Sequence, residues 1–414
     1  MTRRLRVAYL IPVFPEIHNT FILDQITGLI DRGLEVDLYP VAVGSYDKAH
    51  EEVRSYRLRE RVRHIEVPED RVLRLTRFVS ELAKPRSWTR AVLGELNPAR
   101  GTRAMSLVPA YTALSFAANE PYDVVHVAFG NLSPLAERIL TNDRARTGLV
   151  VSFRGADTTS YLRKVPDAYD RVFARGALAL PVSVDLQKRL LAAGSAPERT
   201  IIHRDGVDLK RFAFEERRRE PGEPTRMLFV GRFVEKKGVA DALRAFAAVA
   251  HGAGEGRSGA QFTLVGSGPL EEELRRLAAE LGVADRLRFT GPLDSKAVVK
   301  EMAAAHLFIA PSVTAATGDM EGVPSVIKEA MASGLPVLST RHGGIPELVE
   351  DEVSGYLVEE HDVAALTERL SRLIDQPESW PVLGRAGRAK VEAEYDVDRL
   401  NDRLVEHYES VLKT

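Results

Sequence analysis

Short runs of β-branched and other apolar residues alternate along the chain with segments whose apolar residues recur at helical spacing. Residues 20–31, for example, read T-F-I-L-x-x-I-x-x-L-I, one apolar face of a helix that Gly33 would end. This alternation predicts βα units around a parallel sheet. In the first half, the predicted strands are Arg6–Ile11, Glu35–Pro40, Val124–Val127, Gly148–Phe153 and Leu178–Pro181.

The same pattern resumes after residues 214–224, a charged segment with Pro and Gly that is typical of an exposed linker. The strands predicted beyond it are Arg226–Val230, Gln261–Val265, Leu287–Thr290, Leu307–Ala310 and Pro336–Thr340. The helices predicted there are Val239–Ala250, Leu270–Leu281, Ser325–Ser333 and an amphipathic last helix at about Val397–Leu412. We therefore expect two similar α/β domains facing a cleft, with the last helix crossing back onto the first domain.

Composition narrows the class of protein. The 57 Lys and Arg residues nearly balance the 59 Asp and Glu residues, so no global field would attract nucleic acid. The absence of cysteine excludes disulfides, thiolate metal sites and cysteine nucleophiles, and favours the cytoplasm. The longest charge-free stretch, residues 106–119, is broken by Pro109 and is shorter than the ~20 residues of a membrane span, so no transmembrane helix is expected.

A basic turn follows the first strand of the second half. Residues 231–238 read G-R-F-V-E-K-K-G and precede a predicted helix. Arg232 and Lys237 beside free helix N–H groups would hold a diphosphate. The alternative is a solvated turn with charged residues, and the segment lacks the Gly-Lys-Ser/Thr order of a Walker loop.

Two glutamates lie near the start of the helix predicted at Ser325–Ser333. Glu321 lies in the loop before it and Glu329 lies about one turn into it, so both can face one cleft. Carboxylates accept hydrogen bonds from vicinal sugar hydroxyls, and the backbone N–H groups of Val323, Ser325 and Val326 can point at phosphate or sugar oxygens. The alternative is that these acids only complement the helix dipole.

Glycine turns recur at strand ends in the second half, at Gly266 with Gly268 and at residues 343–344. Together with residues 231–238 and the Glu-x7-Glu sequence from Glu321 to Glu329, their order and spacing resemble the retaining GT-B glycosyltransferases of glycosyltransferase family 4. The match extends over about residues 200–360. A weaker resemblance lies at residues 14–22, which look like a segment of members that build exported polysaccharides.

The resemblance implies a fold and a function. The fold would be GT-B, with two Rossmann-like, doubly wound parallel-sheet domains. Residues 1–205 would bind the acceptor, residues 206–394 would bind the nucleotide-sugar, and residues 395–414 would form the helix that crosses back. The function would be retaining transfer of a hexose or related sugar, from a UDP or GDP donor as co-substrate, to a hydroxyl of a glycan, a lipid-linked or a small-molecule acceptor.

The resemblance also implies roles for residues. Arg232 and Lys237 would hold the diphosphate, Glu329 the ribose, and Glu321 would face the donor sugar, while the base would lie near Gly291 and Leu293. No cofactor or metal is expected, because the fixed cations would do a metal's electrostatic work. The predicted catalytic residues are Arg232, Lys237 and Glu321, and the predicted donor-binding residues are Glu329, Gly266, Gly268, Gly291, Leu293, Val323, Ser325, Val326 and Arg154.

One departure from the family concerns Arg154, which stands where members commonly carry a histidine. Arginine cannot act as a general base at neutral pH, so Arg154 would bind hydroxyls or phosphate, and the donor sugar stays undefined. On the acceptor side the candidates are His18 and Asn19 in the first loop and His126 at a strand end. The alternative for the histidines is an ordinary buried or loop position.

Two interpretations stay open for the arginine-rich stretch at residues 54–103, which includes Phe78 and Trp88. A helix there could lie on the inner face of an anionic membrane and collect a lipid-linked acceptor, or it could be an insertion with a solvated basic face. Two other functions also stay open: a nucleotide-sugar epimerase of the same fold, and a non-catalytic protein that binds nucleotide-sugars or glycans.

Overall fold

The chain divides into two compact units. The computed structural model describes residues 4–16, 20–47, 49–64, 67–83, 90–96, 106–117, 119, 121–140, 147–252, 254 and 256–413. The first unit comprises Met1–Val182, Gln187–His203 and Asn401–Thr414, and the second comprises Ser183–Leu186 and Arg204–Leu400.

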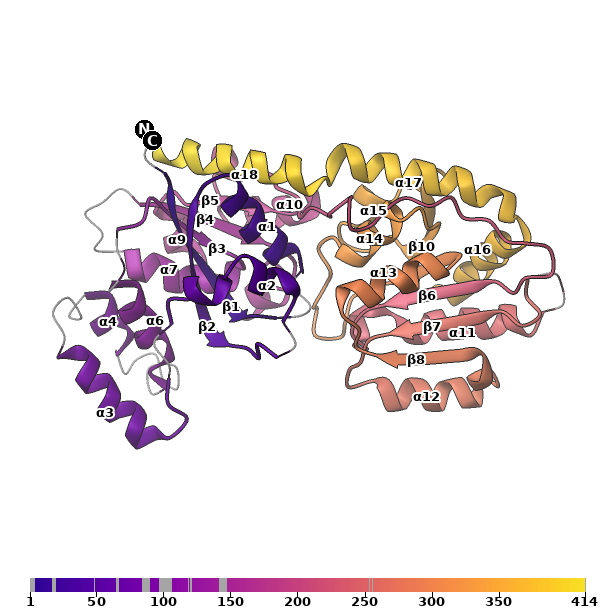
Figure 1. The fold of residues 1–414 in the computed structure, drawn as a ribbon, viewed down its shortest axis with the longest axis horizontal. Helices are drawn as coiled ribbons and strands as arrows, with labels where there is room; N and C mark the ends of the chain where they lie inside the picture. The colour runs from indigo at the N-terminus through magenta and orange to yellow at the C-terminus, as the bar shows by residue number, and fades with distance from the viewer. Residues whose placement is uncertain are drawn as a thin grey trace. The chain divides into compact units, whose positions relative to one another are not determined.

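The first unit is built on a five-stranded parallel sheet in the order β2-β1-β3-β4-β5 (Figure 1). Its elements are β1 (Arg6–Phe14), α1 (Thr20–Asp31), β2 (Glu35–Val43), α2 (Glu51–Ser55), η1 (Leu58–Arg61), α3 (Arg71–Leu82), α4 (Arg90–Glu95), α6 (Val108–Ala117), β3 (Val124–Val127), η3 (Gly130–Leu132), α7 (Ser133–Leu140), β4 (Gly148–Phe153), α8 (Ser160–Lys164), α9 (Asp170–Ala174), β5 (Leu178–Pro181), α10 (Val184–Ala192) and η4 (Pro197–Arg199).

Two apolar cores hold this sheet between layers of helices, and residues of β1 alternate between them. Ala8 and Leu10 belong to one core, and Val7, Tyr9 and Ile11 to the other. This alternation is what a strand buried on both faces requires. The parallel sheet that the alternating pattern predicts is therefore confirmed, although β1 runs three residues further than predicted.

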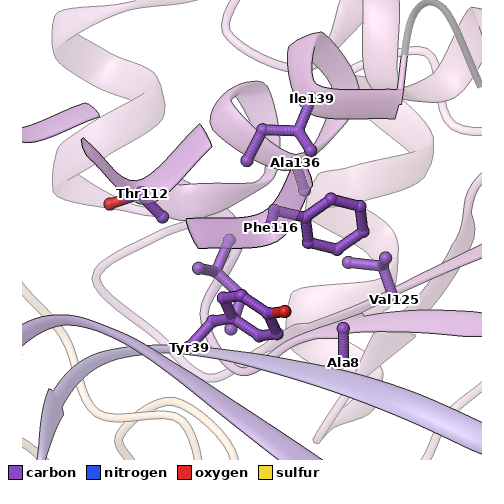
Figure 2. Close-up of a pocket in the computed structure, with 8 residues that line it drawn as sticks. Ala8, Tyr39, Thr112, Phe116, Val125, Ala136 and Ile139 are labelled. Carbon is purple, nitrogen blue, oxygen red and sulfur yellow. The ribbon is translucent and has the colours of Figure 1, made fainter. Parts of the chain in front are cut away.

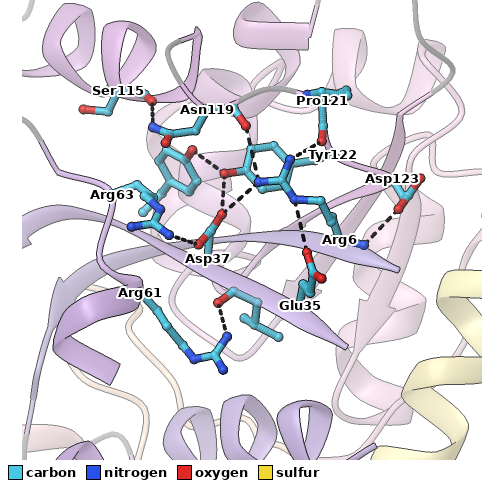
Figure 3. A network of polar contacts seen from close by, with 12 residues as sticks. Arg6, Glu35, Asp37, Arg61, Arg63, Ser115, Asn119, Pro121, Tyr122 and Asp123 are labelled. Atoms are coloured by element: carbon cyan, nitrogen blue, oxygen red, sulfur yellow. Dashed lines mark hydrogen bonds and ion pairs between the residues drawn. The ribbon is translucent and has the colours of Figure 1, made fainter. Parts of the chain in front are cut away.

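A charged network joins the amino ends of the strands (Figure 3). Asp37 accepts a hydrogen bond from the Tyr122 hydroxyl at 2.8 Å and forms ion pairs with Arg6 at 3.3 Å and Arg63 at 2.9 Å. Asp123 accepts from the Arg6 backbone N–H at 2.8 Å. Since ligands of open parallel sheets gather at the carboxyl ends of strands, we assign this network a structural role.

A small pocket lies between the sheet and helices α6 and α7 (Figure 2). It is lined by Ala8, Leu10, Tyr39, Thr112, Phe116, Val125, Ala136 and Ile139. The hydroxyl of Tyr39 is hydrogen-bonded to that of Tyr122 at 2.7 Å, and that of Thr112 donates to the Val108 carbonyl at 3.2 Å. Its polar groups are thus already paired within the protein, and the pocket belongs to the core rather than to a sugar site.

The last helix, α18 (Val397–Leu412), completes the first unit from Asn401 onward. Leu404 and Tyr408 are fully buried in the core that also contains Val7 and Tyr9. The Asn401 side chain donates to the Asp24 carbonyl at 3.1 Å. The end of the chain is therefore part of the core of its first unit.

The second unit contains a six-stranded parallel sheet in the order β11-β10-β9-β6-β7-β8. Its elements are β6 (Arg226–Val230), η5 (Glu235–Lys237), α11 (Val239–Ala250), β7 (Gln261–Val265), α12 (Glu271–Glu280), η6 (Ala284–Arg286), β8 (Leu287–Gly291), α13 (Ser295–Ala304), β9 (Leu307–Ala310), α14 (Ser325–Ala332), β10 (Val337–Thr340), α15 (Ile345–Leu348), β11 (Gly355–Val358), α16 (Val363–Asp375), η7 (Pro377–Ser379) and α17 (Trp380–Glu394).

Chain order reverses between β6 and β9. From β6 the chain adds β7 and β8 on one side, and it then returns to place β9, β10 and β11 on the other. The prediction of two Rossmann-like, doubly wound domains is confirmed. In such sheets the loops that follow the two strands at the reversal diverge and leave a ligand crevice at their carboxyl ends.

Candidate functional site

Two loops meet at the carboxyl ends of β6 and β9. One is the basic turn at residues 231–238, and the other runs from Pro311 to Pro324 and leads into α14. Gly238 has φ +63°, and a Cβ on it would lie 1.8 Å from the Pro311 carbonyl oxygen. Only glycine allows this close approach, so the two loops are packed together by a residue that lacks a side chain.

The turn after β7 packs against the basic turn in the same manner. Gly266 has φ +130°, and a Cβ there would lie 2.0 Å from the Gly231 carbonyl oxygen. A Cβ on Gly268 would lie 2.4 Å from the Phe233 carbonyl oxygen. Gly266 and Gly268 therefore act here through close backbone packing, which brings three strand-end loops together.

Two lysines of the basic turn pair with two carboxylates of the loop after β9. Nζ of Lys237 lies 3.1 Å from Oε1 of Glu321. Nζ of Lys236 lies 3.5 Å from the same oxygen and 3.1 Å from Oδ2 of Asp319. We call these four residues the Lys–Glu cluster. It brings together Lys237 and Glu321, which were predicted as separate contributors to one site.

The cluster fixes the charge of Glu321. Burial by itself would raise the pKa of this carboxyl, but the ammonium groups of Lys237 and Lys236 outweigh it and lower the pKa to about 2. Glu321 is therefore an anion throughout the physiological range. It can accept hydrogen bonds from a sugar and offset positive charge, but it cannot supply a proton.

Arg232 lies in the same turn in a different environment. Its side chain is exposed, and within the described part of the chain no group forms a hydrogen bond or ion pair with its guanidinium. Its donors are therefore available to an anion. The basic turn thus contains two lysines bound to carboxylates and one arginine that faces solvent.

The start of α14 contributes backbone donors. Val323, Ser325 and Val326 are half-buried around the first turn, and no side chain of a described residue caps this end of the helix. Glu329 follows in α14 and is 9% exposed. This matches the predicted order of loop, first turn and second carboxylate.

The predicted base-binding residues lie at the end of β8. Gly291 has φ +73° and its carbonyl accepts from the Gly266 N–H at 3.0 Å, which ties the end of β8 to the turn after β7. Leu293 is half-buried beside the core of the second unit. Both therefore belong to the same row of strand-end loops as the Lys–Glu cluster.

Arg154 lies in the first unit, directly after β4. Its guanidinium donates to the Ala128 carbonyl and, at 3.1 Å, to Oε1 of Gln25. It also lies over the rings of Phe21 and Phe129, at 5.0 and 5.4 Å from their centroids. These contacts hold the cation at the carboxyl ends of β3 and β4, which suits binding of oxygen atoms. Gln25, which orients it, was not predicted.

The acceptor-side candidates differ. His18 and Asn19 lie outside the described residues, as does Trp88. His126 is fully buried, and its Nδ1 and Nε2 are hydrogen-bonded to Tyr408 at 2.6 Å and Ser152 at 2.8 Å. The sequence suggested that His126 could reach an acceptor. Instead, both of its ring nitrogens are hydrogen-bonded to core residues, because β3 is the middle strand of the sheet.

A further pocket lies at the carboxyl end of β1 in the first unit. It is lined by Val13, Phe14, Pro15, Glu16, Ile22, Leu23, His50 and Val53. Glu16 and His50 are the titratable residues of an otherwise apolar lining.

Sequence reasoning missed the residues that hold the loop of Glu321. His342 is fully buried after β10, and its Nε2 accepts from the Glu321 backbone N–H at 3.0 Å. Its Nδ1 contacts Oε1 of Glu360 at 2.6 Å. The signal available was a histidine immediately before the glycine pair at residues 343–344.

Two kinds of feature are absent from the described residues. No group of three or more His, Asp or Glu side chains there is arranged to hold a metal ion. No helix there has both the length and the apolar composition needed to cross a bilayer.

Comparison with known proteins identifies relatives along the whole chain. The model of the family described as glycosyl transferases group 1 matches residues 210–390. WcaL of Escherichia coli (strain K12), whose name describes a colanic acid biosynthesis glycosyltransferase, is 32% identical over 97% of this chain and 98% of its own. The amylovoran biosynthesis glycosyltransferase AmsK of Erwinia amylovora is 31% identical over 95% of this chain and 96% of its own.

A solved structure extends the similarity to the fold. HepE of Anabaena, crystallised with UDP and glucose, matches with a TM-score of 0.73 at 20% identity, over 98% of this chain and all of that one. At this identity the likeness concerns the fold, and it confirms the predicted GT-B architecture.

Proposed function

The chain belongs to the group 1 family of glycosyltransferases, and from this premise we propose that it transfers a hexose or related sugar from a nucleoside diphosphate to a hydroxyl of a growing polysaccharide. The two relatives that match almost the whole chain are named for polysaccharide biosynthesis. They support transfer rather than epimerisation or binding without turnover. The observation that carries the proposal is the Lys–Glu cluster, with Arg232 beside it, at the chain reversal of the second sheet.

The proposed reaction is retaining and needs no metal. The diphosphate of the donor binds at Arg232 and Lys237, and the bond between the anomeric carbon and the diphosphate oxygen breaks with its electron pair leaving on that oxygen. The two cations stabilise the negative charge that develops there. The acceptor hydroxyl attacks from the same face and passes its proton to the departing diphosphate.

Two features of the cluster support this scheme. Lys236 and Lys237 pair with Asp319 and Glu321, whereas the Arg232 guanidinium has no carboxylate partner among the described residues and is available to a diphosphate. The lowered pKa of Glu321 keeps a negative charge where the anomeric carbon becomes electron-poor. Glu329 in α14 is proposed to accept from the ribose hydroxyls, with Gly291 and Leu293 beside the base.

The first test is a thermal-shift assay with a panel of UDP-, GDP-, ADP- and TDP-sugars. We expect either the UDP-sugars or the GDP-sugars to raise the melting temperature of the protein. A donor at ~100 times its dissociation constant stabilises by ~2.7 kcal/mol. Transfer is then followed by release of nucleoside diphosphate and by the proton NMR coupling of the product's anomeric proton, with and without EDTA. An epimerised nucleotide-sugar, or stabilisation with no turnover of any donor on any acceptor, would contradict the proposal.

We further propose that the acceptor is collected at an anionic membrane surface through α3. Val72 is 71% exposed, and Leu73, Leu75 and Val79 are each 56–58% exposed. Phe78 faces the core instead. The outward face of α3 is therefore apolar, whereas the alternative from the sequence was a solvated basic face.

The charged residues of α3 indicate what kind of membrane surface it would bind. Arg71, Arg74 and Arg77 share the helix with Glu81, Asp70 caps its first turn, and the Arg74 guanidinium donates to the carbonyls of Pro68, Glu69 and Ser106. An apolar face flanked by arginines suits the boundary between acyl chains and anionic headgroups. Such contact places the first unit where lipid-linked acceptors occur, on the cytoplasmic face of the membrane.

A further inference from the structure

The amide of Glu321 is anchored by a side chain from a different strand-end loop. The Glu321 N–H donates to Nε2 of His342, which is completely buried. Because a backbone amide can only donate, Nε2 must be the unprotonated nitrogen of this ring. The other nitrogen, Nδ1, then carries the proton and donates it to Glu360 at 2.6 Å.

Glu360 is itself held in place. Its Oε2 accepts from the Thr314 N–H at 2.6 Å, and its Oε1 lies 3.2 Å from the Thr314 hydroxyl. Burial raises the pKa of Glu360, but these hydrogen bonds and the one from His342 outweigh it and lower the pKa below its usual value. The carboxylate therefore stays ionised and keeps the proton of His342 on Nδ1.

The glycine after His342 allows this contact. Gly343 has φ +51°, and a Cβ on it would lie 2.3 Å from the Glu321 carbonyl oxygen. The Gly344 N–H donates to the Gly322 carbonyl at 2.8 Å. Three consecutive residues of the turn after β10, residues 342–344, thus contact the backbone of residues 321–322 and hold it in place.

Resting on the proposed function, we infer that His342, oriented by Glu360, is a positioning residue that sets the place of the Glu321 carboxylate beside Lys237. The carboxylate belongs to a loop rather than to a helix or strand, so its place depends on what fixes that loop. A shift of about 1 Å in a group at the reacting centre costs on the order of 100-fold in rate. The histidine touches no reacting atom and acts only through Glu321.

Two substitutions of His342 separate this role from simple packing. His342→Leu fills the space but offers no acceptor to the Glu321 amide. His342→Gln places an amide oxygen near the position of Nε2 and restores an acceptor. A matched control is His306→Leu in the same unit, since His306 is 3% exposed and its Nδ1 accepts from the Arg226 N–H at 3.1 Å.

The first readout needs no substrate. Hydrogen–deuterium exchange of the full chain, followed on peptides covering residues 312–324, is expected to be at least ~10-fold faster in His342→Leu than in wild type. His342→Gln is expected to restore slow exchange, Glu360→Gln to lie between the two, and His306→Leu to leave these peptides unchanged. Exchange in His342→Leu equal to wild type overturns the inference whatever the activity, as does exchange that His306→Leu raises equally.

The second readout is the rate of nucleoside diphosphate release from UDP-glucose or GDP-mannose, whichever is turned over. His342→Leu is expected to lower kcat by about 10- to 100-fold, with the Kd for free UDP or GDP within about twofold of wild type, and His342→Gln to recover most of kcat. An unchanged kcat overturns the inference. If wild type turns over no nucleotide-sugar at all, the proposed function fails, while the exchange experiment still decides whether His342 holds Glu321.

Discussion

Arg232 and Lys237 lie five positions apart in one turn, but their surroundings differ. Lys237 is paired with Glu321 at 3.1 Å and is 15% exposed, whereas the Arg232 side chain is exposed to solvent. A paired cation contributes to the fold as well as to binding. An exposed cation without a partner among the described residues adds little to the fold, so we expect stability to be unchanged when Arg232 is removed.

Arg232→Ala is therefore expected to lower kcat by about 100-fold or more, the cost of one preorganised donor to developing charge, with an unchanged melting temperature. Arg276→Ala, at an exposed arginine of α12, is the control and should leave both unchanged. Steady-state kinetics and calorimetry measure the two quantities. A folded Arg232→Ala protein with near-normal turnover would remove Arg232 from the proposed site.

Glu321 gives the fold a dependence on acid pH. Its pKa falls from an ordinary 4.5 to about 2, so its ionised form stabilises the fold above about pH 4.5, and this stabilisation is lost as the pH falls through about 2. The shift corresponds to about 3 kcal/mol. Glu321→Gln is expected to lower the free energy of urea unfolding by about that amount at pH 7, with the difference from wild type narrowing between about pH 5 and pH 3. A difference that does not change with pH would contradict this account.

Among the elements, α3 combines apolar exposure with positive charge. A Val72→Ser, Leu75→Ser, Val79→Ser triple variant is expected to lower cosedimentation with phosphatidylglycerol vesicles by at least ~10-fold, because each side chain gives up part of its ~1.5–3 kcal/mol of burial. Wild-type binding should be weaker to phosphatidylcholine vesicles and in high salt.

The control is Val382→Ser in α17 of the second unit, which is 59% exposed and should leave vesicle binding unchanged. Neither variant should change the free energy of unfolding by more than about 0.5 kcal/mol, since these side chains already face solvent. Wild-type protein that stays in the supernatant with phosphatidylglycerol vesicles would exclude the membrane proposal.

Periodicity predicted every strand of the described chain except β11, but it gave bounds for only a few of the helices. Helix α1 and the central strands of both sheets have the predicted bounds within three residues, since long apolar patterns bounded by Gly or Pro carry strong local signals. Strand β11 was not predicted, and neither were the bounds of most helices, among them α6, α7 and α10 in the first unit and α13, α16 and α17 in the second. Strand β11 lies at the edge of the sheet, where its place is set by pairing with β10.

The site was predictable only as separate pieces. Lys237 and Glu321 stood out because each lies in a strand-end loop of recognisable type. Their contact depends on β6 and β9 being neighbours, which is a property of strand order and not of any local pattern. The role of His342 was invisible for the same reason, because its partner amide lies in a loop that follows another strand.

At the scale of the whole molecule, the two units differ in whether they are formed by one stretch of the chain or by separate stretches. The second unit is nearly continuous, from Arg204 to Leu400, whereas the first is completed by Asn401–Thr414. Tyr408 shows how much the first unit depends on this segment. It is fully buried, and its hydroxyl bonds His126 at 2.6 Å.

Tyr408→Ala is expected to destabilise the first unit by about 4 kcal/mol, the range for removing a large buried ring. Leu412→Ala, in the same helix at a site 37% exposed, should cost less than about 1 kcal/mol. Calorimetry of the full chain measures both, with the transition of the second unit as internal reference. Equal effects of the two substitutions would contradict the assignment of α18 to the core of the first unit.

Helix α18 also sets the order of events on the ribosome. Translation delivers the strands of the first sheet before the second unit, yet Leu404 and Tyr408, which close the core of that sheet, follow the second unit. The second unit can thus fold before the first unit has its last helix, and a chain cut after Leu400 would keep all of the second unit but leave the core of the first unit open.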